Sequence, residues 1–170
     1  LFRKARQSGV KTVLDVVLPG PGDHWPKLEP LLAETDVFLP NEDEAAAITG
    51  VANPREQAKR FRDAGARTVV ITRGERGSLL ATDGLSVQAP PYPTTFVGGT
   101  GAGDAFDAGF IAGMLAGEDP IGCLKWGAAL GASCVRSISA TESVFTREEA
   151  VQFMAANELN LTATDEGDPR

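Results

Sequence analysis

The chain has 170 residues, enough for one domain with a hydrophobic core, and its 42% hydrophobic and 23% charged residues are typical of a globular protein. Its net charge is −7 and its lysines and arginines form no basic stripe, so we expect no nucleic-acid partner. The longest uncharged apolar stretches, residues 108–117 and 126–135, are far shorter than the roughly 20 residues of a membrane helix. We therefore expect no membrane partner either.

Strand-like and helix-like patterns alternate through the first half of the chain, which predicts an α/β fold with a largely parallel sheet. Loops are expected where prolines and glycines gather, at 19–26 and 89–95, and the polar tail at 165–170 is expected to fray. The predicted elements, in chain order, are a strand at 11–18, a helix at 27–34, a strand at 36–39, helices at 41–48 and 54–64, a strand at 67–72, a hairpin of strands at 78–81 and 85–88, and helices at 104–116, 120–135 and 147–155.

The two cysteines, Cys123 and Cys134, form no Cys-x-x-Cys pair and lie in apolar, helical sequence. This setting predicts buried free thiols, and reduced cysteines favour a cytoplasmic protein. The chain begins with Leu1 rather than methionine and shows no signal-peptide pattern. We expect it to be a piece of a longer protein.

A glycine-rich turn at residues 98–104, Gly-Gly-Thr-Gly-Ala-Gly-Asp, leads into a helix on which Phe106, Phe110 and Met114 share one face. Such a turn presents free N–H groups and the positive end of the helix dipole, an arrangement that favours a phosphate or another anion. A carboxylate at Asp104 is unfavourable beside an anion unless it acts chemically. Phosphoryl transfer to an alcohol would require such a carboxylate as a base, because the attacking hydroxyl must lose its proton.

We therefore predict that Asp104 is the catalytic base and that Gly101, Ala102 and Gly103 form an anion hole for the phosphoryl group. The alternative is a glycine-rich turn in which Asp104 only caps the helix. A Walker A loop is excluded because the chain has no Gly-Lys dipeptide, and the glycines do not fit Gly-x-Gly-x-x-Gly. The single histidine, His24, lies in a predicted loop and is most simply a surface residue, so we expect neither a histidine metal site nor a Ser-His triad.

Residues 98–106 resemble the signature of the ribokinase-like (PfkB) carbohydrate kinases, which usually has the sequence Asp-Thr-Thr-Gly-Ala-Gly-Asp-x-Phe. Asn41 and Glu44 fit the Asn-x-x-Glu motif of that family, which implies that they organise Mg²⁺ and phosphate, with Glu44 acting on the metal largely through water. Taken alone, these two residues favour the simpler interpretation, an Asn helix cap followed by a solvated acidic first turn.

Two further segments resemble nucleotide-binding parts of the same family. Residues 72–77 are similar to its Thr-x-Gly-x-x-Gly segment, although a simple strand-to-strand turn would have the same composition. Residues 127–132 resemble its Ala-Asn-Ala-Ala-Gly-Ala helix, although small residues there also suit tight helix packing. The resemblance implies that the residues that contact ATP include Thr72, Gly74, Gly77 and Thr100 near the phosphates, and Ala128 and Gly131 near adenine.

The signature departs from the family pattern at Gly98 and Gly99, which replace its first Asp and Thr. In many relatives that Asp helps to bind K⁺, so K⁺ activation is doubtful here and we expect weak or no K⁺ dependence. Family members are also longer, and residues 1–170 correspond to their C-terminal part. The resemblance thus implies a single ribokinase-like domain, a three-layer α/β/α sandwich incomplete at its N-terminal side, with the lid and most sugar contacts absent.

The function implied is ATP-dependent phosphoryl transfer to a sugar hydroxyl, with ATP and Mg²⁺ as cofactors. Two alternatives remain open at the level of sequence. The chain could be a nucleotide-binding or assembly module without catalysis, in which an exposed sheet edge supports a homodimer. The acceptor could also be a nucleoside or a sugar phosphate rather than a sugar.

Overall fold

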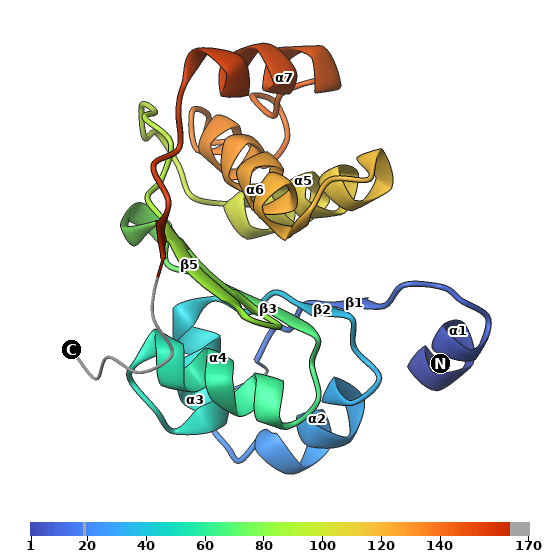
Figure 1. The fold of residues 1–170 in the computed structure, drawn as a ribbon. Helices are drawn as coiled ribbons and strands as arrows, with labels where there is room; N and C mark the ends of the chain where they lie inside the picture. Colours follow the sequence, from blue (N-terminus) through green and yellow to red (C-terminus); the bar gives the residue numbers. More distant parts are fainter. Residues whose placement is uncertain (19, 164–170) are drawn as a thin grey trace. The chain divides into compact units, whose positions relative to one another are not determined.

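The computed structural model describes residues 1–18 and 20–163, and these residues form the α/β fold that the sequence predicted (Figure 1). The predicted tail at 165–170 lies outside the described residues. The elements, in chain order, are α1 (Phe2–Gln7), β1 (Val13–Leu14), α2 (Trp25–Leu32), β2 (Val37–Phe38), α3 (Glu42–Thr49), α4 (Pro54–Asp63), β3 (Thr68–Thr72), a 3₁₀ turn η1 (Gly74–Arg76), β4 (Ser78–Thr82), β5 (Leu85–Ala89), α5 (Ala102–Ala116), α6 (Pro120–Cys134), α7 (Arg147–Ala156) and β6 (Thr162–Ala163).

The strands form one mixed sheet in the order β1-β2-β3-β4-β5-β6. β1, β2 and β3 run parallel, with Val37 opposite both Val13 and Thr68, whereas β3 pairs with β4 and β5 pairs with β6 in antiparallel fashion. The expectation of a largely parallel sheet was therefore wrong. Tight connections join β3 to β4 and β4 to β5, and only antiparallel neighbours can be joined by so few residues.

The chain divides into two compact units, each described here by itself. The first contains residues 1–73 and 78–88 with the described residues after 161, and the second contains Gly74–Gly77 and Ala89–Leu161. The prediction of a single domain in a three-layer sandwich concerns how these units are arranged and stays a prediction.

The core of the first unit lies between the strands and helices α2, α3 and α4, which Figure 1 shows on one face of β1–β3. Phe38 of β2 and Phe61 of α4 are fully buried, and their rings meet edge to face at 4.9 Å. Local sequence sets the limits of α3, because Asn41 caps its start and Gly50 ends it in the left-handed conformation. This packing fixes the carboxyl ends of the three parallel strands, where several predicted site residues lie.

The second unit is built on α5, α6 and α7, with α5 and α6 in unusually close contact. A Cβ atom at Gly113 would lie 2.8 Å from the Cα of Cys123, and one at Gly127 would lie 3.0 Å from the carbonyl oxygen of Phe106. Glycine is therefore required where the two helix backbones approach each other. Cys123 and Cys134 are buried and unpaired, as the sequence predicted.

Some element limits differ from the predictions. The predicted strand at 11–18 is reduced to Val13–Leu14. The last hydrogen bond of this ladder runs from the Leu39 N–H to the Leu14 carbonyl oxygen, and the next N–H on that side, from Asn41, donates to Glu44 instead. α5 begins at Ala102, two residues before the predicted start, and α1 and β6 had not been predicted. Among the described residues, no helix is both long enough and apolar enough to span a bilayer.

Candidate active site

The N-terminus of α5 is shaped by Gly101, which adopts the left-handed conformation with φ +80°. A side chain at this position would also collide with Ala140, since a Cβ atom would lie 2.7 Å from the Ala140 Cβ. Within the described residues no side chain caps this helix end. The N–H of Ala102 donates to the carbonyl oxygen of Gly99 at 3.2 Å, and that of Ala105 to Gly101 at 2.8 Å. The N–H groups between them, at Gly103 and Asp104, have no hydrogen-bond acceptor among the described residues, which is an arrangement that suits an anion.

Gly103 stands apart from Gly101, because the chain itself does not require a glycine there. A Cβ atom at position 103 would meet nothing within 4 Å, and the residue has no positive φ. Gly103 is exposed, as is Asp104 beside it. The missing side chain leaves the backbone of the first helical turn open to a molecule that approaches from solvent.

Asp104 occupies the third position of α5 and is not the residue that caps the helix, a place taken by Gly101. The alternative was that Asp104 only caps the helix, but its side chain makes no capping hydrogen bond to this helix end. Among the described residues no lysine or arginine forms an ion pair with Asp104. An exposed carboxylate without a cationic partner, next to uncapped N–H groups, fits a base better than a structural acid.

Gly98 is held closely by the loop that follows α6. A Cβ atom at position 98 would lie 3.1 Å from the carbonyl oxygen of Ser137 and 3.2 Å from the Cα of Ile138, tighter than most side chains tolerate. At Gly99 the same atom would come no nearer than 3.8 Å, to the ring of Phe96. The loop at Ser137 and Ile138 therefore leaves little room for a side chain at position 98, where the family signature has Asp and this chain has Gly.

Asn41 and Glu44, in the first unit, form a reciprocal capping box. The Glu44 N–H donates to Asn41 Oδ1 and the Asn41 N–H donates to Glu44 Oε2, both at 2.9 Å. Partial burial raises the pKa of Glu44, the nearby charges of Asp15 and Asp43 add to this rise, and the hydrogen bonds from Asn41 oppose it. The cap is therefore real, and it leaves the other carboxylate oxygen of Glu44 without a part in the capping box.

Asp15 is a candidate that the sequence analysis missed. It follows β1 as Asn41 follows β2, and because these strands are parallel both residues lie at the same edge of the sheet. Asn41 in turn forms an isolated parallel bridge with Thr72, whose N–H donates to the Pro40 carbonyl at 3.1 Å. The signal that could have identified Asp15 is an acid directly after an apolar strand. Carboxylate and amide oxygens are the ligands that Mg²⁺ prefers, but the described residues contain no cluster of three or more His, Cys, Asp or Glu side chains that could bind a metal directly.

Two other predicted glycines have different surroundings. Gly77 is required by the fold, because it has φ +77° and a side chain there would collide with the carbonyl oxygen of Ala89. Gly74 has φ +57° with open space around it. Both lie in the second unit, whereas Asn41, Glu44 and Thr72 lie in the first. The prediction that these residues act together on ATP stays a prediction.

The adenine contacts predicted on α6 also remain predictions. Ala128 and Gly131 are both half-buried. A Cβ atom at Gly131 would lie 3.5 Å from the Ala102 carbonyl oxygen and from the Phe106 Cβ, an ordinary packing distance. This part of α6 thus packs against the start of α5, as the helix-packing alternative expects.

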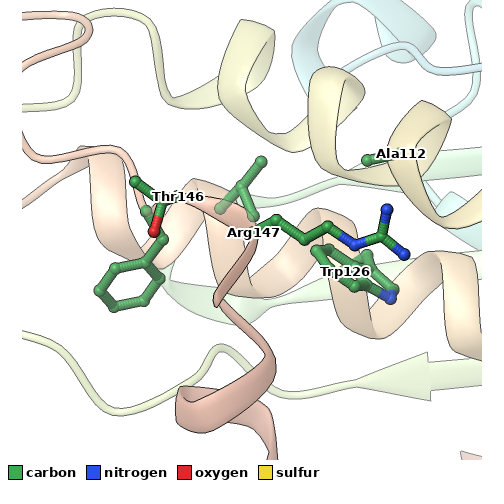
Figure 2. Close-up of a pocket in the computed structure, with 6 residues that line it drawn as sticks. Ala112, Trp126, Thr146 and Arg147 are labelled. Atoms are coloured by element: carbon green, nitrogen blue, oxygen red, sulfur yellow. The ribbon is translucent and has the colours of Figure 1, made fainter. Parts of the chain in front are cut away.

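A small cavity of about 130 Å³ lies elsewhere in the second unit, between α5, α6 and the start of α7 (Figure 2). Figure 2 shows Ala112, Trp126, Thr146 and Arg147 among the residues that line this cavity. Its remaining lining, from Leu130 and Phe145, is apolar. The residues that line this cavity include no carboxylate and none of the predicted site residues.

Known proteins resemble this chain in both sequence and fold. Residues 1–147 match the sequence profile described as pfkB family carbohydrate kinase. The ribokinase of Haemophilus influenzae is 33% identical over 155 residues, which cover 88% of this chain and 49% of that enzyme. The ATP-dependent 6-phosphofructokinase of Thermoanaerobacterium thermosaccharolyticum is 34% identical over 113 residues, which cover 66% of this chain and 35% of that enzyme.

The fold is similar to that of Arabidopsis thaliana ribokinase complexed with ribose and ATP, with a TM-score of 0.79 and 27% sequence identity. This similarity covers 90% of the present chain and 50% of the plant protein. The chain therefore spans half or less of the length of these relatives.

Proposed function

Because this chain belongs to the pfkB family of carbohydrate kinases, we propose that it supplies the phosphoryl-transfer residues of an ATP-dependent kinase that acts on a sugar hydroxyl. The observation that carries the proposal is the exposed, unpaired Asp104 on the first turn of α5, beside N–H groups that no side chain of the described residues caps. A base and an anion site at one helix end are the two parts that such a transfer requires.

In the proposed reaction Asp104 accepts the proton of the acceptor hydroxyl as its oxygen attacks the γ-phosphorus of ATP. The bond between that phosphorus and the β,γ-bridging oxygen breaks, and ADP leaves. Negative charge on the transferring group is stabilised at the glycine-rich turn of Gly101, Ala102 and Gly103, by the N–H groups of Gly103 and Asp104 and by the positive end of the helix dipole. In this role the open position at Gly103 matters most, because the phosphoryl group must approach the backbone there.

Mg²⁺ would be held near the carboxyl ends of the parallel strands by Glu44 and Asn41, with Asp15 adding negative charge. When bound, it would neutralise charge on the phosphates of ATP. Glu44 acts through water in this proposal, since one of its oxygens already accepts the Asn41 N–H. Thr72, Gly74, Gly77 and Thr100 would lie along the phosphates, and Ala128 and Gly131 near adenine.

We propose a sugar as the acceptor because relatives of this chain include sugar kinases. The proteins most similar to this chain include a ribokinase, and the plant ribokinase was solved with ribose and ATP. A sugar phosphate is the second candidate, because the chain is also 34% identical to a 6-phosphofructokinase over 113 residues.

The test is ADP release by the purified chain with MgATP and a panel of sugars, sugar phosphates and nucleosides. Asp104→Asn should reduce acceptor-dependent turnover by roughly 10²-fold or more while ATP binding is kept, because it removes the base without removing the anion site. Asp63→Asn, which changes an exposed aspartate of α4, is the matched control and should leave turnover unchanged. Substantial turnover by Asp104→Asn would exclude Asp104 as the base.

A second candidate function is nucleotide binding without catalysis. It is motivated by the length of the chain, which is half or less of that of its relatives, and by the loss of the signature Asp at Gly98. Binding of MgATP without ADP release for any acceptor would favour it. Acceptor-dependent turnover by the wild-type chain would rule it out.

A further inference from the structure

Cys134, the last residue of α6, lies directly behind the glycine-rich turn. Its side chain is fully buried, and its Sγ lies 3.5 Å from the carbonyl oxygen of Thr100 and 3.2 Å from that of Ala140. The single thiol proton is therefore shared between the carbonyl oxygen of Thr100, the residue before Gly101, and that of Ala140, which packs on Gly101. Both partners are carbonyl oxygens, which can only accept.

The surroundings of Cys134 favour its protonated thiol, the form that can donate a hydrogen bond. Burial raises the pKa of its thiol, and the negative charge of Asp104 adds to the rise. Both effects favour the protonated thiol, which is the form that can donate a hydrogen bond. Because Cys134 is buried, reaction with solvent reagents is not its role.

The last turn of α6 also holds the segment that leads into the glycine-rich turn. The carbonyl oxygen of Val135, just beyond Cys134, accepts from the N–H of Val97 at 2.7 Å and from that of Gly98 at 3.2 Å. The carbonyl oxygen of Ala132 accepts from the Thr94 hydroxyl at 2.8 Å. These carbonyls belong to the helix end, where no partner within the helix is available to them.

The same helix end fixes the loop on the other side of Gly101. The Ser143 hydroxyl lies within hydrogen-bond distance of the carbonyl oxygens of Ser133 and Cys134, at 2.7 and 3.0 Å. Ala140 then presses on Gly101, with only 2.7 Å between its Cβ and a Cβ atom built at position 101. Ala140 therefore lies against Gly101, whose left-handed conformation sets the direction of the first turn of α5.

We propose that Cys134 is a positioning residue for phosphoryl transfer, whose thiol holds the carbonyls of Thr100 and Ala140 so that the N–H groups at Gly103 and Asp104 keep their direction. This inference rests on the proposed function. Cys134 touches neither ATP nor the acceptor and acts only through the turn. Alanine at this position would leave two carbonyls without their donor, and the hydroxyl of serine is shorter and reaches them less well.

The test compares Cys134→Ala and Cys134→Ser with Cys123→Ala. Cys123 is the matched control because it is the other buried thiol of α6, and its Sγ lies near the Glu118 carbonyl, away from the turn. Amide hydrogen exchange at residues 98–106 should be on the order of tenfold faster in Cys134→Ala than in the wild type and unchanged in Cys123→Ala. This measurement requires neither nucleotide nor turnover.

Kinetics supply the second measurement. Cys134→Ala should lower kcat on the order of tenfold with KM for ATP within about twofold, and Cys134→Ser should recover part of the loss. Ala140→Gly removes the side chain that packs on Gly101, so it should also speed hydrogen exchange at residues 98–106 and lower kcat. This variant replaces Cys134→Ala in the test if Cys134→Ala does not fold. Faster exchange together with a loss confined to kcat supports the inference.

Unchanged exchange at 98–106 in both Cys134→Ala and Ala140→Gly would overturn the inference, as would faster exchange with unchanged kcat. If the wild-type chain binds MgATP but turns over no acceptor, it is the proposed function that fails. The comparison then uses ADP with aluminium fluoride, which mimics the transferring phosphoryl group. Weaker binding by Cys134→Ala than by Cys123→Ala would support positioning of the anion site, and equal binding would overturn it.

Discussion

Gly109 of α5 and Trp126 of α6 meet backbone to backbone, since a Cβ atom at position 109 would lie 2.5 Å from the Trp126 carbonyl oxygen. This contact holds the helix that carries Asp104 against the helix that carries Cys134. Neither helix backbone can move aside without disturbing Gly113 and Gly127, which make similar contacts nearby.

The first prediction concerns this contact. Gly109→Ala should lower the free energy of unfolding by about 1–3 kcal/mol, because the added methyl group forces the two helices apart. Urea denaturation of both proteins would measure the change. An equal midpoint would show that α5 and α6 are less tightly packed than the structure has them.

Gly103→Ala is expected to separate stability from activity. The methyl group meets nothing within 4 Å, and alanine favours a helix by up to about 1 kcal/mol over glycine, so unfolding should require as much urea as before or more. Activity should nevertheless fall on the order of tenfold or more, because the methyl group covers the backbone that the phosphoryl group approaches. Full activity in this variant would place the anion site elsewhere.

Asp15→Asn should weaken Mg²⁺-dependent binding of ATP by several-fold, since a negative charge near Glu44 is removed from the proposed metal site. The free energy of unfolding should not fall, because the negative charge of Asp15 repels that of Glu44 and raises its pKa, and the substitution removes this repulsion. Calorimetric titration with ATP at several Mg²⁺ concentrations would show the shift. Asp63→Asn is again the control, and the same Mg²⁺ dependence in all three proteins would remove Asp15 from the site.

The capping box of α7 gives a pH dependence with a defined sign. Hydrogen bonds from the Thr146 backbone and side chain lower the pKa of Glu149, so ionised Glu149 stabilises the fold above its ordinary pKa. That contribution is lost as the pH falls through the lowered value. Glu149→Gln should therefore lose less stability than the wild type on acidification, in urea titrations at a series of pH values. Glu148→Gln, in the same helical turn but outside the capping box, should behave like the wild type.

K⁺ should have little effect on turnover. The carboxylate that would attract a cation is replaced by Gly98, and the carbonyl oxygen of Ser137 lies only 3.1 Å from where a side chain would begin. Replacing Na⁺ with K⁺ at constant ionic strength should change the rate of ADP release by less than about twofold. A steep rise between zero and physiological K⁺ would contradict this.

Much of the local structure was predictable because it depends on residues close together in the chain. Asn41 and Glu44 close a capping box within four residues, and Pro54 and Gly50 mark helix limits by their own conformational preferences. The glycine-rich turn before α5 and the buried cysteines of α6 were likewise apparent from composition and periodicity. The α/β class followed from the order of these local patterns.

Other features depended on contacts between distant segments. The mixed sheet, the shortness of β1 and the place of Asp15 beside Glu44 follow from which strands pair and where their ladders end. Gly77 and Gly101 look like flexible positions in the sequence, yet each is required by a residue that the folded chain brings against it, Ala89 and Ala140.

The sequence by itself therefore determined the helix caps, the α/β class and the glycine-rich turn before α5, because each is set by the side chains and backbone preferences of neighbouring residues. Only the tertiary structure decided which glycines are open to a ligand and which are closed by the protein. Gly103 is open and Gly101 is closed because the loop at Ala140, held by the end of α6, reaches one and not the other.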